Sequence, residues 1–331
     1  MTALFGVFLL TLMVVTAVAI VSTRNLFVAV MLLGIFSLLI AANFFLLDAA
    51  DVALTEAAVG AGISTVLFLG ALALISETER AVTPHRWLSL AVVVSATLVV
   101  LYATFDKPRF GDADAPVHQH GAPWYLEKTP ELIGIPNVVS AVLGSFRGYD
   151  TLGEVFVVFT AGIGVLFLLS ARRGGSGDKP GSTVRPTVAA FGLREDLIPR
   201  VVGRLLAPFI LLFGLYVQFH GEYGPGGGFQ AGALIAAAFI LYALVEGESR
   251  TLEALPAKAL TVLTVSGALL YGGVGLAGMF LGSEFLDYSV LSSDPVTGQQ
   301  IGIILIEAGV GMTVTGVLLS IFFAFAGREQ A

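Results

Sequence analysis

The sequence of 331 residues contains no cysteine, and only 12% of its residues are charged. Without cysteine, the chain cannot supply disulfides, thiolate nucleophiles, iron–sulfur clusters or c-type haem attachment. An ordinary soluble domain has roughly a quarter of its residues charged, whereas here 56% are hydrophobic. The composition therefore excludes cysteine-based redox chemistry within this chain and predicts a membrane protein. The net charge of −7 argues against nucleic acid as a partner.

Histidine is also scarce, with four residues. Only His118 and His120 lie close together, in a polar stretch that reads as a loop. Two ligands do not complete a typical metal site. We therefore expect no metal and no cofactor in this chain.

Long apolar runs are abundant. A helix that crosses a bilayer needs about 20 mostly apolar residues, and nine runs of about this length are bounded by charges or by Pro and Gly clusters. We therefore predict an all-α, polytopic membrane protein with nine transmembrane helices. Their expected limits are 3–21, 26–47, 52–75, 87–104, 152–170, 201–217, 229–245, 260–281 and 301–325.

The basic residues predict the orientation. Short cytoplasmic loops are enriched in Lys and Arg, and an N-terminus outside with a C-terminus inside places thirteen of the 17 basic residues on the inner side. These are Arg24, Arg80, Arg86, Arg172, Arg173, Lys179, Arg185, Arg194, Arg200, Arg204, Arg250, Lys258 and Arg328. The other four lie in one long outer loop, in which that rule is weakest.

Two long connections divide the chain into modules of three, two and four helices. The outer connection, 105–149, ends in an apolar-spaced stretch over 138–146, which predicts a helix at the membrane interface. The inner connection contains RRGGSGDKPGS, which is typical of a flexible basic linker. The expected division is 1–80, 81–175, a cytoplasmic linker over 176–196, and 197–331.

Three acids fall inside predicted spans: Glu56, Glu154 and Glu307. A carboxylate in hydrocarbon costs several kcal/mol, so such an acid usually faces protein or a water path. The three helices enter from outside, and Glu307, about two turns into the ninth, is expected to be deepest. Each acid could pass protons or bind a cation, or could instead reach headgroup water from an interfacial position.

The third span carries Gly60 and Gly62 in mid-helix. Nearby glycines are sites of kinks or π-bulges, which favours a conformational joint. A small-residue packing groove, with Ala58 and Gly62 four apart, is the alternative.

The segment QFHGEYGPGGGFQAG, residues 218–232, connects the sixth and seventh spans. It does not match a nucleotide-binding glycine motif. The run Gly224, Pro225, Gly226, Gly227 and Gly228 breaks the backbone near His220, Glu222 and Gln230. Transporters use broken backbone at membrane depth for ion sites, and an ordinary tight outer turn is the alternative.

The outer segments also collect acids that no basic residue offsets in the short loops. Such a surface could concentrate cations at the mouth of a path, or could be an ordinary solvated face. The acids are Asp48, Asp51, Glu222, Glu284, Asp287 and Asp294.

Three motifs carry a family resemblance. DVALTEAAVGAGISTVLFLGALAL resembles the C-terminal region of the A-type subunit of the Mrp cation/proton antiporters and MbhD of membrane-bound hydrogenases; RGYDTLGEVFVVFTAG resembles MbhE; and GEYGPGGGFQAG resembles the signature of the B-type antiporter subunit, the MnhB domain. The match covers nearly the whole chain in the family's order. The chain thus resembles a fusion of modules that elsewhere lie on separate chains.

The resemblance implies a membrane subunit of a multisubunit Na⁺/H⁺ antiporter, related to the membrane arm of respiratory complex I, and not an enzyme. It implies the plasma membrane of a prokaryote as the location, subunits of the A, C, D, E, F and G types as partners, and Na⁺ and H⁺ as transported ions. In the complex I counterpart of the first module, the NuoJ-type subunit, the third helix carries a bulge. This raises the expectation of a joint at Gly60 and Gly62.

No predicted span contains the lysines of the main pumping subunits, so we expect this chain to help form an ion path and to couple its neighbours. Two alternatives remain open. One is a membrane-arm subunit of a redox-driven pump of the hydrogenase type, and the other is a scaffold that never contacts the ions.

Overall fold

The computed structural model describes residues 2–75, 78–79, 86–109, 111–171 and 196–326. Within these ranges the chain is helical and forms no strand, and nine helices are long and apolar enough to cross a membrane. The predicted all-α class and the nine spans are therefore confirmed. The predicted linker over 176–196 lies almost wholly outside the described residues.

The first nine elements run from α1 to α7. They are α1 (Thr2–Ser22), α2 (Leu26–Leu46), α3 (Ala50–Thr55), the π-helix η1 (Glu56–Ile63), α4 (Ser64–Leu72), α5 (Arg86–Phe105), the π-helix η2 (Val117–Gly121), α6 (Ala122–Leu132) and α7 (Val138–Ala141). Elements α3, η1 and α4 form one continuous span. A π-helix therefore occupies the stretch for which Gly60 and Gly62 predict a kink or a bulge.

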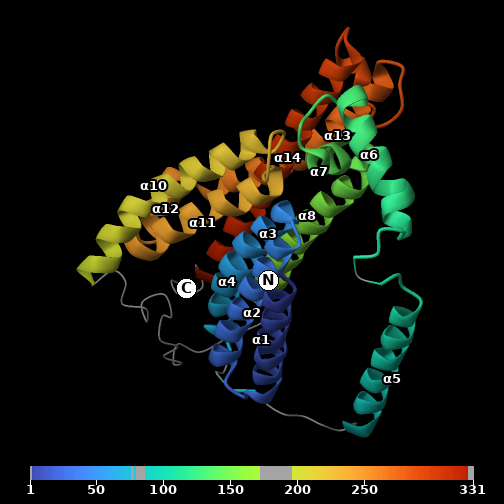
Figure 1. Ribbon diagram of the computed structural model, residues 1–331. Helices are drawn as coiled ribbons and strands as arrows, with labels where there is room; N and C mark the ends of the chain where they lie inside the picture. Colours follow the sequence, from blue (N-terminus) through green and yellow to red (C-terminus); the bar gives the residue numbers. More distant parts are fainter. Residues whose placement is uncertain (1, 76–77, 80–85, 110, 172–195, 327–331) are drawn as a thin grey trace.

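The remaining elements are the π-helix η3 (Val142–Phe146), α8 (Gly148–Ala171), α10 (Leu197–His220), α11 (Gly228–Glu246), α12 (Glu248–Ala254), α13 (Ala257–Phe280), the 3₁₀ helix η4 (Ser289–Leu291) and α14 (Pro295–Ala326). Helix α14 lies at the centre of the molecule and packs against α13, α11, α8 and α4 (Figure 1). It therefore joins parts of the chain that are far apart in sequence.

Small residues let α14 approach its neighbours closely. A methyl group added at Gly232 of α11 would lie 2.8 Å from the carbonyl oxygen of Gly311, and one added at Gly267 of α13 would lie 2.6 Å from that of Gly309. Such contact is typical of membrane helices, which pack through Gly, Ala, Ser and Thr. In contrast, α5 has no buried residue in its span and stands apart from the other helices (Figure 1).

Two stretches differ from the sequence-based expectation. His118 and His120 lie in η2, which continues into α6, and not in a loop. Pro116 precedes η2 and Pro123 lies in the first turn of α6. Proline suits a helix start, because its missing N–H would have no partner there.

Helix α14 is also longer than predicted at its start, because Asp294 caps it. The Asp294 carboxylate accepts a hydrogen bond from the Thr297 N–H at 3.0 Å, and Pro295 occupies the first position. Glu307 therefore lies about three turns, or about 18 Å, into its helix, and not two turns.

The helix predicted over 138–146 is present as α7 and η3. Its small residues face protein: Ala141 is fully buried, and Gly144 contacts Ile303 of α14. Val139 and Leu143, on the other side, are exposed. The stretch thus anchors the outer connection on the central helix.

Candidate functional site

The loop between α10 and α11 packs directly against the Glu307 carboxylate. A methyl group added at Gly221 would lie 3.1 Å from Glu307 Oε2, and one added at Gly227 would lie 3.4 Å from Oε1. Gly227 has a φ of +124°, which L side chains rarely adopt. Glycine at these positions therefore both allows the turn and leaves space for the carboxylate.

Asn137, the N-cap of α7, holds this loop in place. Its side-chain amide donates to the carbonyl oxygens of Gly221 and Gly224, each at 2.9 Å. Ser140 Oγ also donates to the Gly221 carbonyl at 2.6 Å. The broken backbone is thus satisfied by protein groups, as irregular backbone at membrane depth requires.

Asp51, in the first turn of α3, binds the same loop from the other side. Its Oδ1 accepts a hydrogen bond from the Gly226 N–H at 3.2 Å and lies 3.4 Å from Asn137 Nδ2. Gln230, which is buried, places its Nε2 3.5 Å from the Asp51 carbonyl oxygen. Three segments distant in sequence therefore meet at the GPGGG turn.

A cavity of about 190 Å³ borders this junction. Glu307 and Glu154 both line it, on α14 and α8, and Gly226, Gly227 and Gly228 form part of its wall. Asp51 and Glu222 lie close enough to interact electrostatically with Glu307. The other polar residues of the lining are Thr55, Ser140, Thr151 and Gln230, and no described residue of the lining is basic.

Glu222 lies in the same loop, outside the membrane spans. Its Oε1 atom is buried and has no hydrogen-bond partner among the described residues. Burial raises the pKa of the Glu222 carboxyl above its usual value. A group of this kind accepts a proton more readily than an exposed glutamate does.

The remaining predicted residues lie elsewhere. Glu56 is in η1, where its carboxylate occupies the space that Gly60 leaves open, near Ser37 of α2. His220 stacks on Tyr216, with ring centroids 4.7 Å apart. Neither residue lines the cavity. The structure thus brings Glu307, Glu154, Gln230 and the glycine turn together, with Glu222 close by.

Sequence reasoning missed Asn137 as a member of this site and counted Asp51 only as an outer acid. The motif PNVVS carries a usable signal, because Asn is a favoured N-cap residue. Its Oδ1 accepts from the Val139 N–H at 3.0 Å. Nothing in the sequence indicates that the amide of the same side chain reaches a loop more than 80 residues away.

Comparisons with known proteins follow the same division. Residues 198–320 match a domain related to the MnhB subunit of Na⁺/H⁺ antiporters, residues 11–77 match the MbhD subunit of the MBH, and residues 84–179 match its MbhE subunit. A protein of Staphylococcus aureus strain Newman that is named as antiporter subunit mnhB2 is 35% identical over 139 residues. The alignment covers 41% of this chain and 98% of that protein.

Two solved structures are also similar. A chain of the Mrp complex from Dietzia sp. DQ12-45-1b superposes with a TM-score of 0.76 at 27% identity, over 98% of this chain and 35% of that one. This chain therefore spans about a third of the length of the Dietzia chain. A chain of the membrane-bound sulfane sulfur reductase, an archaeal respiratory membrane complex, superposes with a TM-score of 0.51 at 29% identity, over 71% of this chain and 95% of that one.

The GPGGG turn lies inside the matched range of the first model, and the relative from Staphylococcus is covered almost completely. The chain therefore belongs to the family of the MnhB subunit of Na⁺/H⁺ antiporters and joins to it MbhD-type and MbhE-type parts in one polypeptide.

Proposed function

We propose that the chain is a membrane subunit of a multisubunit Na⁺/H⁺ antiporter and that the Glu307 cavity forms part of its ion path. The observation that carries the proposal is the Glu307 carboxylate, set against broken backbone in a cavity that other acids border and no described basic residue lines. An unpaired acid in a membrane is costly and usually marks an ion or proton path.

The chain acts with other subunits and not alone. No described membrane span contains a lysine after its first turn, and the Dietzia chain to which this chain is similar belongs to a complex named Mrp. The partners are further antiporter subunits in the plasma membrane of a prokaryote. The π-helix η1, which packs against α2 and α11, is the element through which this chain couples them.

Reconstitution tests the assignment. Proteoliposomes that contain the complete complex should acidify or alkalinise when a sodium gradient is applied, whereas proteoliposomes with this chain alone should show no sodium-dependent pH change. Sodium-dependent exchange by the isolated chain would contradict its role as one part of a larger antiporter.

A second candidate is a membrane-arm subunit of a redox-driven pump. The similarity to the chain of the sulfane sulfur reductase favours it. The same vesicles distinguish the two, because an antiporter exchanges ions with only the gradient as its driving force. A complex that moves ions only when an electron donor and acceptor are supplied would favour the redox-driven pump.

A further inference from the structure

Two tyrosines are completely buried beside the site. Tyr271 of α13 and Tyr288 of the following loop each have 0% of their surface exposed. The Tyr271 hydroxyl donates to the Gly148 carbonyl oxygen at 2.7 Å, and the Tyr288 hydroxyl donates to that of Gly144 at 3.1 Å. The two hydroxyls are also hydrogen-bond partners of each other.

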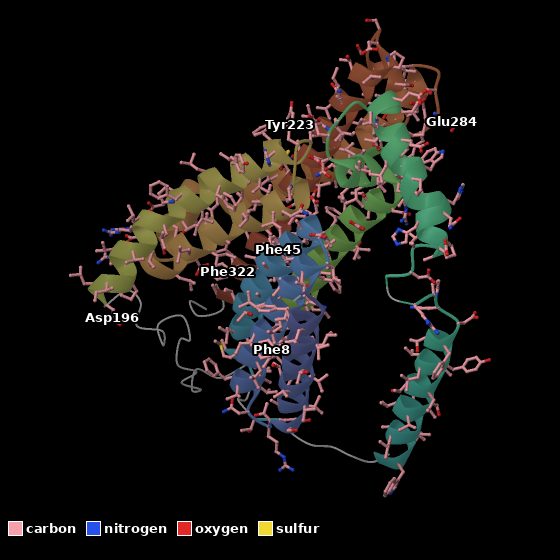
Figure 2. The ribbon with its side chains drawn as sticks, in the orientation of Figure 1. Phe8, Phe45, Asp196, Tyr223, Glu284 and Phe322 are labelled. Carbon is pink, nitrogen blue, oxygen red and sulfur yellow. The ribbon has the colours of Figure 1, made fainter. Side chains whose placement is uncertain are left out.

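These hydroxyls lie between two cavities. The first is the 190 Å³ cavity of Glu307, whose lining includes Gly144, Thr151 and Glu154. The second, of about 440 Å³, is lined by Gly148, Tyr149 and Asp287, among others. It lies at the end of the molecule where Figure 2 labels Glu284, which also lines it.

The tyrosines have a polar neighbour on each side. Thr151, one turn before Glu154 on α8, is a hydrogen-bond partner of the Tyr271 hydroxyl, and Glu154 interacts with it electrostatically. On the other side, Asp287 is adjacent to Tyr288 in the chain and borders the larger cavity. Hydroxyls therefore continue the polar lining from one cavity to the other.

We propose that Tyr271 and Tyr288 form a proton relay between the two cavities. A proton from water in the larger cavity binds the Tyr288 oxygen, the hydroxyl hydrogen of Tyr288 passes to Tyr271, and that of Tyr271 passes on to Thr151 and Glu154. Each oxygen gains one O–H bond and loses one, so no group is oxidised or reduced. A hydroxyl suits this step because it is both donor and acceptor and its hydrogen rotates freely.

The same geometry excludes Na⁺ from this route. A cation needs a continuous space lined by oxygens that replace its water, and both phenol rings are fully buried in packed surroundings. Protons and sodium would therefore reach the Glu307 cavity by different routes. This inference rests on the proposed antiport function and specifies the route of one of its two ions.

Replacement of each tyrosine by phenylalanine in the complete complex tests the relay. Tyr271→Phe and Tyr288→Phe keep the ring and remove the hydroxyl, and Tyr223→Phe is the matched control because that residue is 67% exposed. The relay predicts that the maximal exchange rate per assembled complex falls at least several-fold, with an unchanged sodium concentration for half-maximal rate. It also predicts that D₂O slows the variants more than it slows the wild type.

A purely structural role gives a different result. The hydroxyls would then only satisfy the carbonyls of Gly144 and Gly148, so variants would assemble less well but exchange normally once assembled, and that outcome would overturn the relay. If neither variant assembles, Thr151→Val decides, since it removes the next hydroxyl and keeps the side-chain shape. Wild-type exchange by Thr151→Val would likewise overturn the relay, whereas a wild-type complex without exchange would contradict the antiport function itself.

Discussion

Glu246 and Glu307 are two carboxylates on neighbouring spans with opposite surroundings. The Glu246 side chain is 2% exposed and is paired with Arg200, Arg204 and Arg250, the last at 2.5 Å. Glu307 borders a cavity with Glu154 and Asp51, and no described residue of that lining is basic. One carboxylate is fully committed to arginines, and the other is free to bind an ion. The comparison teaches that pairing, more than burial, separates a structural acid from a candidate carrier.

The contact between α11 and α14 holds the Glu307 side of this comparison together, so its loss should have the largest effect. A methyl group at Gly228 would lie 2.0 Å from the Glu307 carbonyl oxygen and 2.9 Å from Val310 Cβ. We expect Gly228→Ala to abolish assembly of the chain into its complex, as measured by native gel. Gly272→Ala is the control, because nothing lies within 4 Å of a methyl group there; equal assembly of the two variants would contradict the packing.

Neutralisation of Glu246 should affect stability and not transport. Glu246→Gln leaves three half-exposed arginines without their carboxylate, which costs about 1–3 kcal/mol. The thermal unfolding midpoint of the purified complex should fall, while exchange per assembled complex stays at the wild-type level. Glu253→Gln, at an exposed position nearby, should change neither. Loss of exchange by assembled Glu246→Gln would remove the distinction between the two carboxylates.

Glu56 tests whether an acid outside the cavity also takes part. It lies in the π-helix η1 and does not border the Glu307 cavity. We expect Glu56→Gln to give an exchange rate between those of the wild type and of Glu307→Gln, measured in membrane vesicles. Glu79→Gln, at an exposed carboxylate in a loop, is the control. A rate below that of Glu307→Gln would place the main site at the π-helix.

Topology separates the two carboxylates across the membrane. The basic residues predict that the Glu246 end of α11 faces inside and that the loop after α13 faces outside. Because the chain has no cysteine, single substitutions can be labelled cleanly. We expect an impermeant thiol reagent added to whole cells to label Ser283→Cys and not Glu253→Cys. The reverse pattern would invert the orientation without changing the fold.

Much of the fold could be predicted from the sequence, because length and hydropathy alone define a membrane span. The GPGGG turn and Glu307 were also visible, since broken backbone and an acid in an apolar run are local features. Their convergence with Asp51 was not. The contact of Asp51 with Asn137 joins positions 86 residues apart and that with Gly226 positions 175 apart, and such contacts depend on how the helices pack.

The tyrosine pair was invisible for a related reason. Tyr271 and Tyr288 occur in apolar or polar stretches without a motif, and their hydroxyls meet only because Gly148 leaves room above its backbone. The pairing of Glu246 likewise needs α10, α11 and α12 in place. Sequence alone could identify Glu307 as a candidate but not establish which other groups share its cavity.

Exchange by Glu307→Gln, in membrane vesicles and normalised to assembled complex, tests the central claim most directly. Gln matches the shape of Glu and removes the cost of a buried charge, but it cannot titrate. We predict normal assembly with sodium-dependent exchange reduced at least several-fold at several pH values. Wild-type exchange by Glu307→Gln at each pH would contradict the account and make Glu307 a structural residue.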